Sequence, residues 1–502
     1  KKVLWGLVGG VLGIAAVAAL AVLVVVPALR YGNASRLLDD GQYEQAADAF
    51  AALGEYRDSR DMVLECDYRY ALALLEDGGY DEAAEIFEEL DDYRDSAEMV
   101  KECAYREAIA LLESGKYEKA IAAFSEIKDY ADSAAQIAEA HTQIGIAFME
   151  EERYAKALEA FLAAGDYEPA TAQLASLYDS AVAAGKKAVA FKAAAAMDDY
   201  ARIAALNLQL VALESQHALA VSPSGKVMTA GPENKSEFLD TADWTVVESI
   251  VTGPTATLGL RADGAVLAAG PNPWNMNKTQ GWNDIVQVAV GGPGYYHSFG
   301  VRSDGRVEHS GQDQSTDATQ VESWTDIRQI ACGESYTVGL KTDGTIVALG
   351  AAKKFDFSGW SEIVAISGGR HHIVGLKADG TVVATGKDGE GCLDVGDWAG
   401  IVAISAGDEI TAGLRSDGTL VCTQELPGLS DWTGIVSFDT SGKGILAVDK
   451  HGKVYTSFTS EKVAERLAGI ADWGPVAPYD PDRMTVTTTV GGTTTTEHDS
   501  AG

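Results

Sequence analysis

The hydrophobic and polar positions of the chain follow three successive patterns. Residues 3–29 form an uncharged run of mainly Val, Leu, Ala and Gly. Over residues 36–206, apolar residues recur three and four positions apart, which indicates helices with one buried face. Over residues 207–478, alternating Val, Ile and Leu are separated by Asp-Gly pairs, which is typical of short strands joined by tight turns. The sequence therefore predicts a hydrophobic segment, a helical region and a β-region.

The hydrophobic run over 3–29 is long enough to cross a membrane, because about 20 helical residues span the roughly 30 Å hydrocarbon layer. Lys1 and Lys2 precede the run, whereas Arg30 and Arg36 are followed by a strongly acidic segment. Since positive residues favour the cytoplasmic side, we expect a single-pass membrane protein of bacterial type with its later regions outside the cell.

Two points about this first region stay open. Small residues at Ala19, Ala21 and Ala28 would also suit a peptidase, so a cleavable signal peptide is the alternative to a membrane anchor. The sequence begins with Lys rather than Met, and we therefore expect an upstream portion of unknown content.

Three aromatic columns recur every 37 residues in the helical region, and a fixed period of this kind is typical of a solenoid. The columns are Tyr43, Tyr80, Tyr117 and Tyr154; Phe50, Phe87, Phe124 and Phe161; and Tyr56, Tyr93, Tyr130 and Tyr167. Aromatic residues at helical spacing are expected to form the core between units, with a peptide-binding groove as the alternative. Cys66 and Cys103 share one repeat position and are expected to be small buried residues.

Each unit is expected to contain two helices. Asp58, Asp95 and Asp132, each followed by Ser, precede the second helix, where a short side-chain oxygen accepts from an unpaired backbone N–H. We interpret these residues as side-chain N-caps. The Gly-x-Tyr-x-x-Ala pattern followed by Phe, in two-helix units, resembles the tetratricopeptide family, whose own period is 34 residues. The resemblance implies an α-helical solenoid over 36–206.

The β-region contains seven units. Five turns carry Asp-Gly, at Asp263, Asp304, Asp343, Asp379 and Asp417, and Ser224-Gly225 and His451-Gly452 take the same place at the two ends. We expect type I′ turns, which require positive φ at both central residues. Eight residues before each turn glycine lies one register position, occupied by His217, Ala256, His297, Tyr336, His372, Ile410 and Gly444. Six units also open with Trp, and Trp473 follows the last unit.

The His-x-x-Gly-Leu, Asp-Gly and terminal Gly marks resemble repeats of the regulator of chromosome condensation family. The resemblance implies an all-β propeller of seven blades over 207–478, and the short units are similar to the β-lactamase inhibitor propeller of the same superfamily, with three strands in each blade. The first unit lacks an opening Trp. We therefore predict that the segment Trp473–Ala477 packs beside the first unit and closes the ring.

The composition excludes some classes of function. The chain has 39 Lys and Arg against 74 Asp and Glu, a net charge of −35, which opposes binding to phosphate backbones, so we expect no nucleic-acid partner. Five Cys among 502 residues lack the clustering of a disulfide framework or a zinc module. The end of the chain, 479–502, is rich in Thr and is expected to be a flexible tail.

No catalytic template occurs in the sequence, such as a phosphate-cradling Gly loop, a His-Glu-x-x-His or a Gly-x-Ser-x-Gly elbow. His217, His297 and His372 share the register position with Ala, Ile and Gly in other units, which favours a structural role over an axial metal site. We therefore assign no catalytic residue, no metal and no cofactor.

Aromatic residues outside the repeating pattern are candidate contacts for a partner, because aromatic side chains anchor interfaces disproportionately. These candidates, together with two loop neighbours, are Trp274, Asn275, Met276, Tyr295, Tyr296, Phe355 and Phe357. Packing between neighbouring blades is the alternative role. The Tyr pair is the better lead, since a three-residue expansion separates Trp282 from His297.

These observations predict a membrane-anchored, non-catalytic binding or scaffold protein. The propeller loops are expected to recognise a protein or a glycan, with the solenoid as a stalk or a second interaction surface. One alternative is a carbohydrate-active or other hydrolytic enzyme that uses acids in the propeller channel. The other is a scaffold that assembles envelope complexes through its solenoid.

Overall fold

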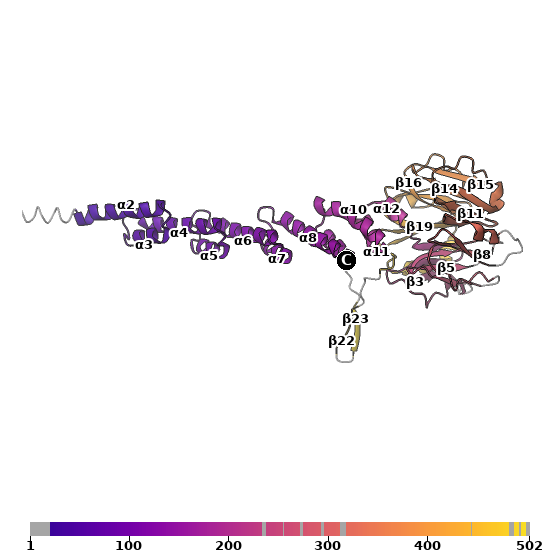
Figure 1. The fold of residues 1–502 in the computed structure, drawn as a ribbon, viewed down its shortest axis with the longest axis horizontal. Helices are drawn as coiled ribbons and strands as arrows, with labels where there is room; N and C mark the ends of the chain where they lie inside the picture. The colour runs from indigo at the N-terminus through magenta and orange to yellow at the C-terminus, as the bar shows by residue number, and fades with distance from the viewer. Residues whose placement is uncertain are drawn as a thin grey trace, which may run out of the picture. The chain divides into compact units, whose positions relative to one another are not determined.

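The computed structural model consists of helical repeats followed by seven three-stranded sheets, a propeller-like arrangement (Figure 1). By contacts the chain divides into two compact units, with the boundary between Gln173 and Leu174. The structure describes residues 21–232, 237–254, 256–271, 275–292, 296–311, 318–442 and 444–480, and the backbone of 486–490 and 493–497.

The expected single-pass membrane location is wrong. Among the described residues, no helix is long and apolar enough to cross a membrane. A π-helix over Ala21–Val25 leads into α2, Val26–Asp39, and α2 carries Arg30, Arg36 and Asp39. The membrane contact inferred from this segment has no support. Residues 3–20 of the predicted span lie outside the described residues.

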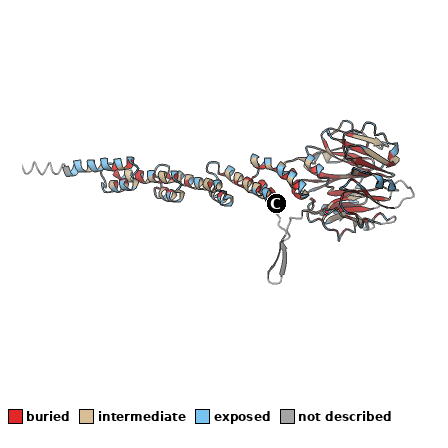
Figure 2. Ribbon diagram, in the orientation of Figure 1, coloured by how far each residue is buried: buried red, intermediate tan, exposed pale blue. Residues whose placement is uncertain are grey.

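The first unit consists of successive helix pairs, and the aromatic columns lie between them. All four Phe of the repeating column are almost completely buried, Phe161 being 1% exposed and the others 0%. Figure 2 shows buried residues along the facing sides of these helices. Cys66 and Cys103 are buried as well. These positions confirm the core interpretation of the Phe column. The helices are α3 (Tyr43–Ala51), α4 (Ser59–Glu76), α5 (Tyr80–Glu89), α6 (Ser96–Glu113), α7 (Tyr117–Glu126), α8 (Ser133–Glu150), α9 (Tyr154–Ala163) and α10 (Glu168–Ala183), which crosses the boundary.

The Asp residues before the second helices are not side-chain caps. Asp58, Asp95 and Asp132 hold the N-cap position, but none makes a side-chain bond to the backbone of its helix. Each accepts instead from a Tyr hydroxyl of the preceding unit, as in Tyr68 to Asp95 at 2.6 Å and Tyr105 to Asp132 at 2.5 Å. Each of these Tyr residues lies 27 residues upstream of its Asp, on the neighbouring unit. Its hydroxyl therefore bonds to the carboxylate in place of a backbone N–H of the helix. The Asp column therefore joins units rather than capping helices.

A second set of bonds runs in the opposite direction between the same units. Tyr93 donates to Glu65 at 3.0 Å and Tyr130 donates to Glu102 at 2.8 Å, so the third aromatic column also bridges units. Glu65 is additionally paired with Arg94 of the next unit at 2.6 Å. Since each unit donates and accepts across the same junction, the repeat spacing is fixed by polar bonds as well as by the Phe core.

The described part of the second unit contains seven three-stranded antiparallel sheets, each with its strands in the order inner, middle and outer. We call each sheet a blade. Strands of the first four blades are β1 (Val211–Leu213), β2 (Ala218–Val221), β3 (Val227–Ala230); β4 (Val247–Thr252), β5 (Thr257–Arg261), β6 (Val266–Ala269); β7 (Ile285–Val290), β8 (His297–Arg302), β9 (Val307–Gly311); and β10 (Ile327–Cys332), β11 (Tyr336–Lys341), β12 (Ile346–Gly350). The remaining blades are β13 (Ile363–Gly368), β14 (His372–Lys377), β15 (Val382–Gly386); β16 (Ile401–Ala406), β17 (Thr411–Arg415), β18 (Leu420–Cys422); and β19 (Ile435–Ser441), β20 (Gly444–Asp449), β21 (Val454–Phe458).

The turns between middle and outer strands are not of type I′. In each of them only the glycine has a positive φ, for example 79° at Gly264, while Asp263 does not. The Asp263 carboxylate accepts from the backbone N–H of Ala265 at 3.2 Å, and Asp343, Asp379 and Asp417 make the corresponding bond to Thr at 2.9 Å. The Asp is therefore selected for this side-chain bond, and only the Gly for its left-handed backbone.

The Trp that opens a unit packs on the middle strand of its own blade. In the fifth blade a Cβ on Gly375 would lie 2.7 Å from the Trp360 ring, so the indole occupies the space that any larger residue would need. The same close approach recurs between Gly339 and Trp324. This contact explains why Trp and the Gly of Gly-Leu recur together in the sequence.

The ring closes as the sequence predicts, with the C-terminal segment beside the first blade. Trp473 donates through Nε1 to the carbonyl of Thr229 in β3 at 3.2 Å. Val476 donates to Gly452 of the seventh blade, as Val247 donates to Gly225 at an ordinary junction, and Ala477 donates to Val221 of β2. The C-terminal segment therefore bonds to both the first and the seventh blade.

Two further helices, α11 (Lys187–Ala196) and α12 (Tyr200–Ala205), belong to the second unit and pack on the blades. Tyr200 lies against the turn glycine Gly418, where a Cβ would approach its ring to 2.5 Å. Lys187 pairs with Glu248 of β4, and Lys192 pairs with Asp480 at 2.7 Å. The helices therefore cover the end of the blades that carries the Asp-Gly turns, which we call the turn end.

Part of the Thr-rich tail forms a hairpin of β22 (Val486–Val490) and β23 (Thr493–Glu497). We expected this tail to be flexible because it lacks a core. The high β-propensity of Thr explains the pairing.

Replacing Tyr68 by Phe tests the bonds between the helical units. The variant keeps the ring but leaves Asp95 without the hydroxyl, and we expect the free energy of unfolding of the helical unit to fall by about 1 kcal/mol. Denaturant titration followed by circular dichroism at helical wavelengths measures the change. Tyr70→Phe in the same helix is the matched control, and an equal loss in both variants would contradict the role of the Asp column.

Replacing Val476 by Asp tests the closure of the ring. Val476 is 2% exposed, so an unpaired carboxylate there should destabilise the propeller by about 3 kcal/mol or more. Val286→Asp, at a Val that is 43% exposed, is the control for the charge itself. Thermal unfolding followed by the near-ultraviolet signal of the Trp residues should show a lower midpoint for the first variant only. Equal midpoints would show that the C-terminal segment does not hold the ring.

Candidate functional site

At the register position, which we call the tether position, His217 and His372 join neighbouring blades, whereas His297 Nδ1 lies 2.7 Å from His309 Nε2 of its own blade. His217 Nε2 lies 2.7 Å from Thr252 Oγ1 of the next blade, and His372 Nε2 lies 3.0 Å from Thr411 Oγ1. Tyr336 donates its hydroxyl to the carbonyl of Gly369 at 2.8 Å in the same way. All these side chains are buried. The described residues contain no group of three or more ligands that could hold a metal ion.

Two residues before each tether lies the tip of the loop that joins the inner and middle strands. In the described loops these tips are Ser215, Pro254, Glu334, Arg370, Asp408 and Gly442, and all six differ; in the third unit the sequence has Tyr295 at the same offset, outside the described residues. We call the surface formed by these tips and the residues that follow them the loop-tip face. It lies at the end of the blades opposite to the turn end, because the strands run antiparallel.

Neighbouring loop tips are bonded to one another through their backbones. Glu334 donates its backbone N–H to the carbonyl of Arg370 at 3.0 Å, and Arg370 donates to Gly407 at 3.1 Å. The approach is close, since a Cβ on Gly369 would lie 2.3 Å from the carbonyl oxygen of Gly407. The loop tips are therefore presented on a rigid backbone rather than on independent loops.

A charged cluster of three side chains lies on the loop-tip face. Arg370 Nε lies 2.9 Å from Glu334 Oε2, and His371 Nε2 lies 3.1 Å from the same oxygen. The hydrogen bond from Arg370 holds the pKa of Glu334 below its usual value. The Arg370 side chain is 44% exposed and that of His371 is 41% exposed. A cation, an imidazole and a carboxylate are thus fixed relative to one another and open to a partner.

The predicted contact residues fall into three groups. Trp274 and Tyr295 lie outside the described residues. Asn275 is exposed and has a positive φ of 61°, and Tyr296, which follows a loop tip, is half-buried. Met276 is completely buried, so it packs in the core and is not a surface contact.

Phe355 and Phe357 belong to an aromatic chain that packs on the fourth and fifth blades. The ring centroids of Phe355 and Tyr336 are 5.3 Å apart, and those of Phe357 and Trp360 are 5.0 Å apart. Both Phe residues are partly buried against that core cluster. Their packing matches the alternative of contact between neighbouring blades, while their role in binding stays a prediction.

The sequence interpretation missed Glu334, Arg370 and His371. The signal was available, because a fixed offset of two residues from the tether identifies the loop tip in every unit. Residues that differ between otherwise regular units are candidates for function, since they are not needed for the common fold.

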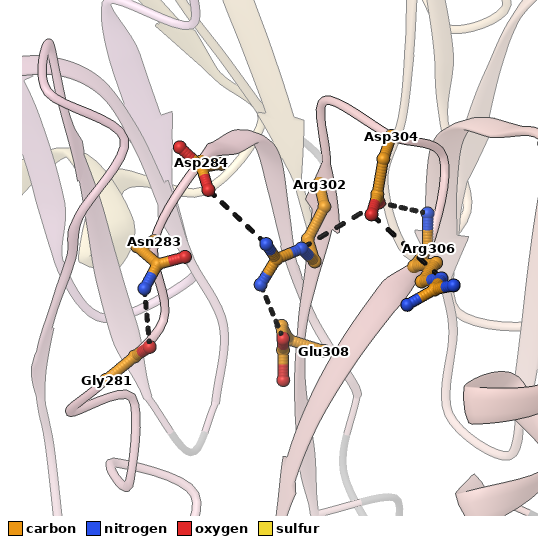
Figure 3. A network of polar contacts seen from close by, with 7 residues as sticks. All are labelled: Gly281, Asn283, Asp284, Arg302, Asp304, Arg306 and Glu308. Carbon is orange, nitrogen blue, oxygen red and sulfur yellow. Dashed lines mark hydrogen bonds and ion pairs between the residues drawn. The ribbon is translucent and has the colours of Figure 1, made fainter.

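The turn end has a different electrostatic character, in which cations are held by several acids. In the third blade Arg302 lies 3.3 Å from Asp284, 3.1 Å from Glu308 and 3.7 Å from Asp304 (Figure 3). Arg306 approaches Asp304 as well, at 3.9 Å. Exposed networks of this kind contribute little stability and leave few charges available to a ligand.

Burial lowers the pKa of His372 from 6.5 to about 4, so the unfolded chain gains a proton at a higher pH than the folded chain. The stability contributed by neutral His372 is therefore complete above about pH 6.5 and is lost as the pH falls toward 4. We expect about 2 kcal/mol of loss between pH 7 and pH 5 that His372→Gln does not show, because Gln does not titrate. Denaturant titrations of both proteins at the two pH values measure the difference, and parallel losses would contradict it.

No family model and no curated protein matches the chain. Among solved structures, the chain is similar to the ectodomain of the receptor kinase CR4 of Physcomitrella patens, at 15% identity and a TM-score of 0.41, over 48% of this chain and 70% of that one. It is similar to Prp20p of Saccharomyces cerevisiae, at 16% identity and a TM-score of 0.36, over 52% and 85%. MamA of Desulfovibrio magneticus matches at 22% identity and a TM-score of 0.16, over 34% and 90%. At such low values, the fold assignment rests on the repeats and sheets themselves.

Proposed function

We propose that the chain is a non-catalytic binding protein whose propeller presents the loop-tip face to a protein partner. The observation that carries the proposal is the contrast between two positions only two residues apart. The tether position is buried in every blade, whereas the loop tip carries a different side chain in every unit. A regular scaffold that holds variable surface loops is typical of recognition proteins.

The chemistry of the loop-tip face favours a protein as the partner. Arg370, His371 and Glu334 supply hydrogen-bond donors and acceptors in a fixed arrangement, and Tyr296 adds an aromatic side chain on the same face. Arg and Tyr are enriched among the residues that dominate protein interfaces. The ordered backbone of the tips lowers the entropy lost on binding, which favours affinity.

Reversing the charge of Arg370 tests this proposal. The full chain is used as bait for chemical cross-linking and quantitative mass spectrometry, with wild type, Arg370→Glu and Arg306→Glu compared in parallel. Arg306 lies beside an Asp-Gly turn at the turn end and is the matched control. We expect at least one partner to be captured by wild type and by the control but reduced about tenfold or more with Arg370→Glu, because interfacial charge pairs contribute strongly when desolvated.

The double variant Glu334→Arg with Arg370→Glu separates recognition from local damage. It restores an opposite-charge pair between the two tips but exchanges the charges that a partner meets. Capture should remain low in the double variant. An identical set of captured proteins for all four chains would contradict the proposal, and full recovery in the double variant would show that only the internal pair matters.

A further inference from the structure

A cleft of about 430 Å³ lies at the turn end, between α12 and the fourth to sixth blades. Ala201, Ala204 and Ala205 form its helical wall, and Val364 and Val402 are apolar residues that line it from the blades. Its volume is within the range of sites that bind small molecules. Every one of these residues belongs to the second unit, so helix and blades form the cleft together.

Two cations, Arg328 and Lys377, line this cleft, and no Asp or Glu does. Neither cation forms an ion pair with a carboxylate of the described residues, in contrast to Arg302 with its three acids. The Arg328 guanidinium donates to the carbonyl of Val364, which turns its head group toward the cleft wall. In a chain with a net charge of −35, two cations without acid partners in one cleft are notable.

The nearest acid in sequence to Lys377 is committed to its own turn. Asp379 accepts from the Thr381 hydroxyl at 2.6 Å and from the Thr381 backbone N–H at 2.9 Å. These bonds, with a smaller contribution from Lys377, keep the pKa of Asp379 below its usual value. The Asp379 carboxylate is therefore satisfied locally, and Lys377 retains its donors for another anion.

Comparison between blades shows that Arg328 is not required by the repeat. Its position, one residue into the inner strand, holds Val286, Val364, Val402 and Val436 in other blades. Glu248 occupies the same position in the second blade, where it pairs with Lys187 of α11. In the second blade, the charged residue at this position therefore pairs with a residue outside the blade. In the fourth blade, no carboxylate of the described residues pairs with Arg328.

We infer that the cleft binds a small organic anion, with a carboxylate or phosphate head held by Arg328 and Lys377 and an apolar body against α12. Charge-assisted hydrogen bonds from the two cations would fix the head group. The apolar residues Val364 and Val402 would exclude water from the rest of the ligand. This site lies at the opposite end of the blades from the loop-tip face and does not rest on the proposed function.

Ligand-observed NMR titrations of the full chain test the inference. Sodium octanoate and octyl phosphate are the anionic probes, and octan-1-ol is the neutral probe of equal chain length. We expect saturable binding of at least one anion and about tenfold weaker binding of the alcohol. Of the two anions, the one that binds more tightly identifies the head group. Failure of both to saturate, or equal binding of the alcohol, would overturn the inference.

Variants locate the binding. Arg328→Gln and Lys377→Gln should each weaken binding of the anion about tenfold, since each removes one charged donor. Lys341→Gln is the matched control. Lys341 lies opposite Ile327 in the strand register of the fourth blade, as Lys377 lies opposite Ile363 in the fifth, but Lys341 does not line the cleft. Thermal unfolding confirms that each variant is folded. Unchanged affinity in both cleft variants, or an equal loss in the control, would overturn the assignment.

Discussion

The propeller depends on one constraint, which is that each blade buries its faces only against its neighbours. The first blade must therefore pack against the seventh. It does so through direct bonds: the Leu210 backbone donates to Ser437 at 3.1 Å, and Leu213 donates to the carboxylate of Asp439 at 2.9 Å. Desolvation raises the pKa of Asp439 to about 6, because the junction between the first and seventh blades is packed closely enough to exclude water from this carboxyl group. The ends of the propeller sequence are thus joined by packing and by polar bonds.

This closure determines what the two ends of the blades can do. Because the tethers from His217, Tyr336 and His372 cross the blade junctions just inside the loop-tip face, the tips inherit a fixed spacing. At the turn end, α12 packs directly on the blades, and its Tyr200 needs the space that Gly418 leaves free. One end therefore displays variable side chains to the surroundings, while the other end is shaped by a helix of the same chain.

Most of the fold could be predicted from the periodicity of the sequence, whereas the local bonds of individual side chains could not. The 37-residue columns, the Trp and Asp-Gly marks and the position of Trp473 predicted the helix pairs, the seven sheets and the closing segment. The role of Asp95 could not be predicted from its own surroundings, because its partner Tyr68 lies in another unit. The type I′ prediction failed because the Asp263 side chain bonds to the backbone of Ala265, and only the following Gly264 adopts a positive φ. Met276 shows the limit of the candidate site, since a residue outside the repeat pattern can still be core.

The distribution of charge connects these levels. The chain as a whole has more acids than bases, so most cations are expected to find a carboxylate, as Arg302 and Lys187 do. In the helical unit, Glu65 and Asp95 accept hydrogen bonds from Tyr residues of neighbouring repeats. These acids therefore stabilise the stacking of the repeats. Against this background, Arg370 retains an exposed guanidinium although Glu334 holds it, and Arg328 faces a cleft without an acid. Cations such as these, which stay accessible after folding, are the groups best placed to bind another molecule.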